Sequence, residues 1–307
     1  MLSLRSSIKM AWALTLLAAA GSAAQAPEAV EEPAGALFAN GFESGNTLAW
    51  SDRFPPLPAP DAFRILDLDL RDPHVFVDIP VFGCVDFTDD ALPAGLGPSF
   101  NDSLQAAIES DGDGDGLLDF SFILGFRPFL ETAAGERLDA GCGLCTDPPA
   151  TTVCDWDRAV AIPRTTTYDG LTAGLCLDAL PGTTSGYDPP VAATVAPCVG
   201  SNVGLAPIIV LVVAGIPIVF EDGQIAGTLV GDPVFRLEGG LVRGFLSEAV
   251  ADSIVLPGPA GDITLSSLLP GGQGSCAAGD DRDLLDGVSG WWFYLEHVAE
   301  EIDFVGD

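Results

Sequence analysis

Short runs of alternating apolar and polar residues recur after residue 60, and this pattern constrains the fold more than any other feature. The alternation is clear at 66–71, 75–79 and 120–126, where every second side chain is apolar. A period of two is typical of β-strands that bury one face. The 36 Gly and 24 Pro residues supply the turns that many short strands require. The sequence therefore predicts a mostly β fold.

Two further segments in the second half of the chain predict strands. Residues 216–219 and 225–230 flank Asp222-Gly223, a dipeptide that favours a tight hairpin turn. Residues 292–298 predict a last strand near the C-terminus.

The uncharged segment 203–220 has two interpretations. Its length and apolar character are compatible with a membrane helix. However, it contains Pro207 and Pro217, and β-branched residues dominate it. These features favour two buried strands that are separated at Ala214-Gly215.

Few helices are expected. Phe100, Leu104, Ala107 and Ile108 fall on one helical stripe, with Asn101 as a plausible N-cap. A second apolar stripe lies within 241–250, before Pro257. We expect residues 61–307 to form a single β-rich domain, an antiparallel β-sandwich with two or three short helices.

The N-terminus has the organisation of a secretory signal peptide at residues 1–26. Arg5 and Lys9 precede an apolar run that is too short to span a bilayer, and small residues follow that run. The mature protein is therefore predicted to be secreted or periplasmic/extracellular, with no integral membrane span.

Residues 27–60 are rich in Pro and Glu and are typical of a linker. This lead contains Gly41-Phe42-Glu43-Ser44-Gly45, followed by Trp50. The segment resembles a short G-F-E-S-G motif with a downstream Trp that recurs near the ends of exported proteobacterial proteins. The resemblance implies an exported bacterial protein and no particular activity. Phe42 and Trp50 could anchor a turn on the main domain, and Trp50 could also stack on a sugar.

The charge excludes some partners. Twelve Lys and Arg residues face 44 Asp and Glu residues, giving a formal net charge of −32. Nucleic acids and anionic lipid surfaces both require a basic protein surface. Hydrophobic residues make up 48% of the chain, so this acidic protein still has enough apolar side chains for a sizeable core.

The chain has seven cysteines, and export makes disulfide bonds their expected state. They are Cys84, Cys142, Cys145, Cys154, Cys176, Cys198 and Cys276. Because the number is odd, at least one thiol must stay free or pair with another molecule. A zinc site formed by Cys142, Cys145, Cys154 and Cys176 is an alternative, and a redox dithiol at Cys142 and Cys145 is another. Both are less favoured because exported thiols usually oxidise. The spacing alone does not define the disulfide pairs.

The strongest chemical motif is the acidic, glycine-rich stretch at 111–119. It places carboxylates at alternate positions, and Gly116 permits the sharp bend that follows them. Hard oxygen ligands at this spacing suit Ca²⁺ rather than a transition metal. The expected ligands are the side chains of Asp111, Asp113 and Asp115, the carbonyl of Leu117, and Asp119 directly or through water. An acidic solvated turn without an ion is the alternative.

This loop resembles the calcium loops of EF-hand and dockerin-type modules, with two differences. Its twelfth position is Phe122, where an EF-hand has a bidentate Glu. The sequence after the loop alternates like a strand, so helix–loop–strand is expected. One ligand must therefore come from elsewhere or from water, so a structural calcium ion is expected with modest affinity, in the ~10⁻⁴–10⁻³ M range of extracellular modules.

The sequence contains no recognised catalytic motif. The chain has only two histidines, His74 and His297, and no nucleophile elbow, zincin motif or phosphate loop. Asp67 and Asp69 share a strand face at a spacing tolerable for glycoside hydrolysis, although Arg71 nearby makes a solvated face the simpler interpretation. A second acidic group, within 86–90, is interpreted as a solvated turn.

These observations favour a secreted binding or envelope-associated protein, stabilised by calcium and disulfides, without catalysis of its own. Its extracellular ligand is not defined by the sequence, and a glycan or an apolar molecule would fit. Two alternatives are a secreted hydrolase, possibly directed at polysaccharide, and a carrier of an apolar ligand. Paired buried carboxylates beside aromatic residues would favour the hydrolase, and a large internal cavity would favour the carrier.

Overall fold

The computed structural model describes residues 60–112, 114–146, 152–160, 162–202, 204–205, 208–213, 216–258 and 261–306. The predicted signal peptide and almost all of the lead, including the G-F-E-S-G motif, lie outside these residues. In the described part, no helix is long and apolar enough to cross a membrane.

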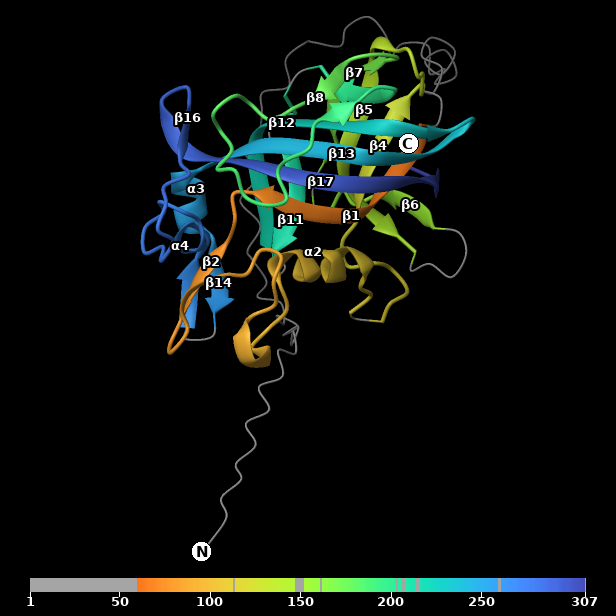
Figure 1. The fold of residues 1–307 in the computed structure, drawn as a ribbon. Helices are drawn as coiled ribbons and strands as arrows, with labels where there is room; N and C mark the ends of the chain where they lie inside the picture. The colour runs from red at the N-terminus through yellow and green to blue at the C-terminus, as the bar shows by residue number, and fades with distance from the viewer. Residues whose placement is uncertain are drawn as a thin grey trace, which may run out of the picture. The chain divides into compact units, whose positions relative to one another are not determined.

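Eight antiparallel strands close into a barrel (Figure 1). In chain order, each strand pairs with the next one in the ring, and the last pairs with the first. The ring strands are β1 (Asp61–Asp72), β4 (Phe122–Arg127), β5 (Ala134–Cys145), β7 (Arg164–Leu171), β10 (Cys198–Ser201), β12 (Ile216–Gly231), β13 (Val234–Ser247) and β17 (Val288–Phe304).

The predicted antiparallel β-sandwich is therefore wrong. A sandwich leaves edge strands in each sheet, whereas β1 and β17 pair from Ala62↔Ile302 to Asp72↔Tyr294. This pairing provides partners for the backbone groups that two edge strands would otherwise expose. The prediction of a mostly β fold with few short helices is confirmed.

The remaining elements are insertions between consecutive ring strands. They are β2 (Phe76–Ile79), β3 (Gly83–Asp86), η1 (Pro93–Gly95), α2 (Phe100–Glu109), β6 (Val153–Trp156), β8 (Leu175–Leu177), β9 (Thr194–Val195), β11 (Ile208–Val213), α3 (Glu248–Ser253), β14 (Val255–Gly258), β15 (Gly261–Thr264), α4 (Leu265–Leu268) and β16 (Asp283–Leu285). Because the ring strands repeat one regular arrangement, the features that distinguish this barrel lie mostly in these insertions.

Helix α2 confirms the first predicted helical stripe. Its N-cap is Ser99 rather than Asn101, and Ser99 forms a reciprocal capping box with Asp102. The buried residues of α2 pack into the same core as the inner face of the barrel. At the other end, the buried guanidinium of Arg64 on β1 donates hydrogen bonds to the Ile108 carbonyl and to Ser121. The helix is thus attached to the barrel at both ends.

Two local predictions in the second half of the chain are wrong. Residues 241–247 belong to strand β13, and only the short helix α3 follows them. Asp222-Gly223 does not turn the chain: β12 continues through it with a register shift, and Asp222 has a positive φ of 49°. The expected break near 214–215 separates β11 from β12, which pair as a hairpin.

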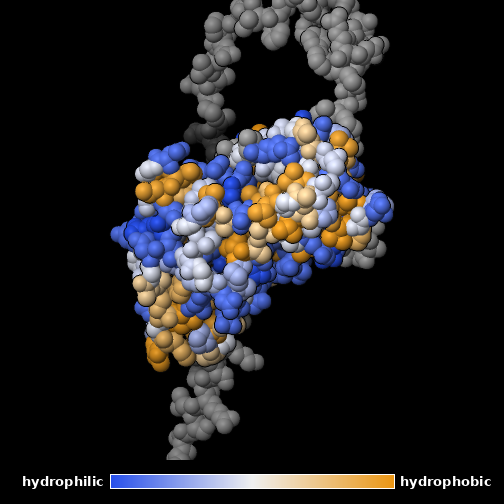
Figure 2. Space-filling model, turned by 45° about the horizontal axis from the view of Figure 1, so that its top comes forward, coloured by the Kyte–Doolittle hydropathy of each residue, from blue (hydrophilic) through white to orange (hydrophobic). Residues whose placement is uncertain are grey.

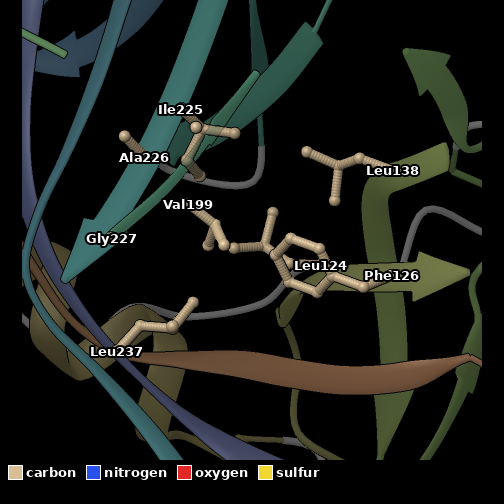
Figure 3. A pocket seen from close by; sticks show the side chains of 9 residues that line it. Leu124, Phe126, Leu138, Val199, Ile225, Ala226, Gly227 and Leu237 are labelled. Carbon is tan, nitrogen blue, oxygen red and sulfur yellow. The ribbon is translucent and has the colours of Figure 1, made fainter. Parts of the chain in front are cut away.

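The barrel interior is filled by side chains. Residues from β4, β5, β10, β12 and β13 point towards one another around a cavity of about 10 Å³ (Figure 3). That volume is close to the minimum for one water molecule. Leu124, Phe126, Leu138, Val199, Ile225 and Leu237 are among the residues that line it.

A long insertion covers part of the barrel's outer surface. We call residues 177–197, which lie between Cys176 and Cys198, the strap. Leu177, Leu180 and Val191 of the strap pack on an apolar patch of the outer wall. That patch is formed by Leu241, Phe245, Trp292 and Tyr294. Strands β13 and β17 are therefore buried on both faces where the strap lies.

Three disulfides stabilise the insertions. Cys84–Cys276 joins the β2–β3 hairpin to a distant loop, Cys145–Cys154 joins β5 to β6, and Cys176–Cys198 closes the strap. Cys142 is the free, buried cysteine. Three disulfides in one chain are typical of proteins that fold in an oxidising extracellular or periplasmic compartment.

The exposed apolar side chains are dispersed. On the face drawn in Figure 2, apolar residues form several separate patches between hydrophilic ones. Val81, at the turn between β2 and β3, is fully exposed, and Ile162 and Leu284 are 73% and 72% exposed. Single exposed apolar residues are normal for a folded protein.

His297 on β17 is 3% exposed and lies opposite Gly240 of β13. A Cβ at Gly240 would approach the imidazole ring to 2.3 Å, so glycine provides the space that the ring occupies. Nε2 of His297 lies 3.1 Å from the Ala226 carbonyl. In the neutral tautomer that carries its proton on Nε2, the ring donates a hydrogen bond to this oxygen. Burial lowers the pKa of His297 to about 4 from 6.5.

We predict that His297 makes the fold sensitive to acid. Below pH 6.5 the unfolded chain takes up a proton on this imidazole, whereas the folded protein keeps the ring neutral down to about pH 4. The stability of the fold is therefore fully present above pH 6.5 and is partly lost as the pH falls towards 4. Urea unfolding of wild type and His297→Gln should therefore diverge, with wild type losing about 2–3 kcal/mol more between pH 7 and pH 4.5. Parallel pH profiles would contradict the burial of a neutral histidine here.

Candidate functional site

The predicted calcium loop connects α2 to β4, so the expected helix–loop–strand arrangement is present. The loop is fixed at its end by Leu118, which is buried and donates its backbone N–H to the Cys145 carbonyl at 2.8 Å. Leu117 forms a bridge with Thr146. The loop therefore contacts the strand that carries the Cys145–Cys154 disulfide.

The carboxylates of the loop organise its backbone. Asp111 accepts hydrogen bonds from the backbone N–H groups of Gly114, Asp115 and Gly116 at 2.8–3.0 Å. Asp119 accepts one from Gly112 at 3.0 Å and another from the Ser110 hydroxyl at 2.7 Å. Asp115 accepts the Leu117 N–H at 2.8 Å.

The loop atoms that we expect to bind a metal are all oxygens, which suits a hard cation. Gly114 and Gly116 have φ of 74° and 87°, which glycine adopts easily, and they curve the chain around the carboxylates. Asp113, the central predicted ligand, lies outside the described residues. Within the described residues, no group of three or more His, Cys, Asp or Glu side chains is arranged to hold a metal.

The zinc and redox alternatives for the cysteines are not supported. Cys145 and Cys154 are bonded to each other, and Cys176 is bonded to Cys198. Burial and the charge of Asp157 raise the pKa of the remaining Cys142 thiol to about 11. That thiol is therefore a poor nucleophile and a poor metal ligand at neutral pH.

The structure places Asp69 of the carboxylate pair on β1 in an ion-pair network. Asp69 and Glu296 both form ion pairs with Arg71, at 2.9 and 3.0 Å, whereas Asp67 is exposed to solvent. Asp89 lies 3.8 Å from the same guanidinium. Arg71 thus holds three carboxylates in one structural network.

The structure divides the acidic group at 86–90. Asp89 accepts a hydrogen bond from the Asn101 amide at 2.8 Å, while Asp90 is exposed. Asp86 lies 2.6 Å from Nδ1 of His74 and also accepts the backbone N–H and the hydroxyl of Thr88. Asp86 therefore makes specific hydrogen bonds although its side chain is 39% exposed, and the solvated turn at 86–90 stays a prediction.

His74 and Asp86 belong to a larger cluster that sequence reasoning missed. The imidazole of His74 stacks on the ring of Tyr187, with centroids 3.8 Å apart and an interplanar angle of 9°. The hydroxyl of Tyr187 donates to Asp281 at 2.5 Å. Asp72, two residues before His74, accepts the backbone N–H of Ser185 at 2.8 Å. We call these residues the His74 cluster.

Four parts of the chain position this cluster. Asp72 is the last residue of β1, His74 follows that strand, and Asp86 ends the β2–β3 hairpin. Ser185 and Tyr187 belong to the strap, and Asp281 lies in the loop before β16. The Cys84–Cys276 disulfide joins the hairpin to that loop. The strap is held by Tyr294, whose hydroxyl accepts the Leu180 N–H at 3.1 Å.

Burial sets the protonation of the cluster. Asp72 is 3% exposed, and burial raises its pKa to about 7. In contrast, hydrogen bonds from His74 and Thr88 outweigh the burial of Asp86 and lower its pKa. Burial also raises the pKa of Asp283. Two carboxyls near one histidine thus have pKa values shifted in opposite directions, which is a frequent property of functional sites.

The Asp72 carboxyl predicts a distinctive pH dependence. The folded protein keeps its proton up to about pH 7, whereas the unfolded chain releases it near 3.8. Its contribution to stability is therefore present below pH 3.8 and lost as the pH rises through 7. Asp72→Asn should change the free energy of unfolding, relative to wild type, more favourably at pH 8 than at pH 4. The difference between the two effects should be about 2–4 kcal/mol.

Urea unfolding at both pH values would measure this effect. Asp90→Asn, which changes an exposed acid nearby, is the matched control and should have little effect at either pH. An Asp72→Asn variant that loses stability at pH 8 would show that the ionised carboxylate stabilises the fold.

No family model, curated protein or solved structure matches the chain.

Proposed function

We propose that this chain is an exported, calcium-stabilised binding or envelope-associated protein without catalysis of its own. The three disulfides of the barrel are consistent with an extracellular protein. The predicted signal peptide and the G-F-E-S-G motif support the same location. The acidity of the chain favours neutral or cationic partners over nucleic acid or anionic lipid.

The observation that carries the calcium proposal is the position of the 111–119 loop. This loop joins the end of α2 to β4, and Leu118 also attaches it to β5 next to the Cys145–Cys154 disulfide. A bound Ca²⁺ would connect these elements electrostatically and neutralise adjacent carboxylates. Asp111, Asp113 and Asp115 would hold it by their side chains, and Leu117 by its carbonyl. Asp119 would bind directly or through water.

Binding is favoured over the other two functions considered. The hydrolase alternative requires carboxylates that folding brings together as an acid–base pair. Asp69 is instead ion-paired with Arg71, and Asp86 is hydrogen-bonded to His74. An apolar carrier requires a large internal cavity, and the cavity that Leu124, Phe126 and Leu138 line has about 10 Å³, far below the size of a lipid. We therefore place the proposed ligand at the insertions.

Calorimetric melting with 10 mM Ca²⁺ or with chelator tests the calcium proposal. For an affinity of ~10⁻⁴–10⁻³ M, the ion should add about 1.4–2.7 kcal/mol to the free energy of unfolding. Asp113→Ala combined with Asp115→Ala should abolish the shift. Asp90→Ala, which removes an acid outside the loop, should keep it. No shift in wild type, or the same shift in the double variant, would reject the calcium site.

A further inference from the structure

We propose that the His74 cluster is a binding site for a slender cationic group with N–H donors, an alkylammonium or guanidinium group. The inference rests on the proposed binding function and adds a ligand class and a location. It is carried by the hydrogen-bonding capacity of two buried side chains, His74 and Asp72, and by the charges around them.

The hydrogen bonds of Asp86 define the tautomer of His74. An ionised carboxylate only accepts, so Nδ1 of His74 must donate its proton to Asp86 across the 2.6 Å contact. In the neutral ring, Nε2 is then an acceptor with a free lone pair. Nε2 is buried and has no hydrogen-bond partner, and His74 as a whole is 6% exposed. A buried acceptor of this kind favours a ligand that donates a hydrogen bond.

Asp72, two residues before His74, adds a second buried acceptor. Its carboxylate accepts one described hydrogen bond, from the Ser185 N–H, although a carboxylate has about four acceptor positions. The charged groups that act on its pKa are Asp281, His74 and Asp283. The basic side chain closest in sequence to these acids, Arg282, is directed to Asp280 and Glu248 instead. Within the described residues, no arginine forms an ion pair with Asp72.

The sign of the charge selects the ligand. Asp72, Asp86, Asp281 and Asp283 are all acidic, and His74 is the single basic group among their described contacts. An anion would be repelled, and a neutral hydroxyl would satisfy hydrogen bonds without balancing charge. A metal ion is less suitable, because the described residues contain no group of three metal-ligating side chains. An N–H cation satisfies both acceptors and compensates the carboxylates.

The strap makes the site rigid and narrow. Ser185 and Tyr187 hold Asp72 and His74 from one side, and the Cys176–Cys198 disulfide closes the strap. Arg243 also anchors it by donating to the Asp178 carbonyl at 2.7 Å. Because Asp72 and His74 are 3% and 6% exposed, we expect the ligand to reach them with a thin terminal group. Selectivity for a primary ammonium over a quaternary one follows.

Nuclear magnetic resonance of the histidine side chains can test the site directly. The chain has two histidines, so His74 is observed beside His297, which serves as an internal reference in the barrel wall. The probe is n-butylammonium, added at pH 8 and constant ionic strength with 10 mM Ca²⁺, where Asp72 is ionised. We expect a saturable shift of the Nε2 resonance of His74 and no shift of His297.

Two variants and two further probes complete the experiment. Asp72→Asn should weaken n-butylammonium binding at least tenfold, and Asp90→Asn should leave it unchanged. Tetramethylammonium, which has no N–H, and methyl glucoside, which has no charge, should produce no saturable shift. The proposal is overturned if n-butylammonium causes no saturable shift, if Asp72→Asn responds like wild type, or if either further probe binds equally well.

This outcome is separable from the calcium proposal. The calcium-dependent melting shift is measured without n-butylammonium, and it depends on the 111–119 loop rather than on the His74 cluster. If the amine fails to bind while the calcium shift remains, the ligand assignment alone is wrong. If the amine binds while the calcium shift is absent, the His74 cluster is supported and the calcium site is rejected.

Discussion

The antiparallel pairing of β1 with β17 is the constraint on which the rest of the structure depends. It joins the first and last strands of the ring, so every ring strand has two neighbours. Closure places the inner side chains in one packed core. Specific chemistry is consequently located on the insertions, and both candidate sites lie there: the 111–119 loop after α2 and the His74 cluster beside the strap.

The local pattern of residues predicted the strands better than their arrangement. Alternation at 66–71 identified β1, because that part of the strand has one buried face and one more exposed face. The large apolar residues at every second position of 120–126 identified β4, although β4 is buried along its whole length. Alternation says nothing about whether the first strand meets the last, so barrel and sandwich could not be distinguished. The pairing partners are separated by most of the chain.

The wrong helix at 241–250 has a physical cause. Val242 and Leu246 of β13 face the barrel core, while Leu241 and Phe245 face the strap. A strand that is buried on both faces loses its alternation, and its apolar residues happen to follow a helical spacing. The error at Asp222-Gly223 is similar, since a residue pair that favours turns also suits an irregularity within a strand.

The two candidate sites differ in how easily they can be recognised in the sequence. The acidic loop can be recognised because its predicted ligands are close together in the chain. The His74 cluster was not, because Asp86, Tyr187 and Asp281 reach His74 only through folding. The Asp-Pro-His segment at 72–74 was its one local signal, and a single histidine beside an acid is too common to identify a site.

The strap also has an evolutionary consequence. Strands β13 and β17 are covered on both sides, whereas β7 keeps part of one face exposed to solvent. Side chains in a doubly covered strand must fit two packed environments at once. Tolerance to substitution should therefore vary around the ring, with diversity concentrated on the uncovered side and the strap-bearing wall changing slowest among descendants of this chain.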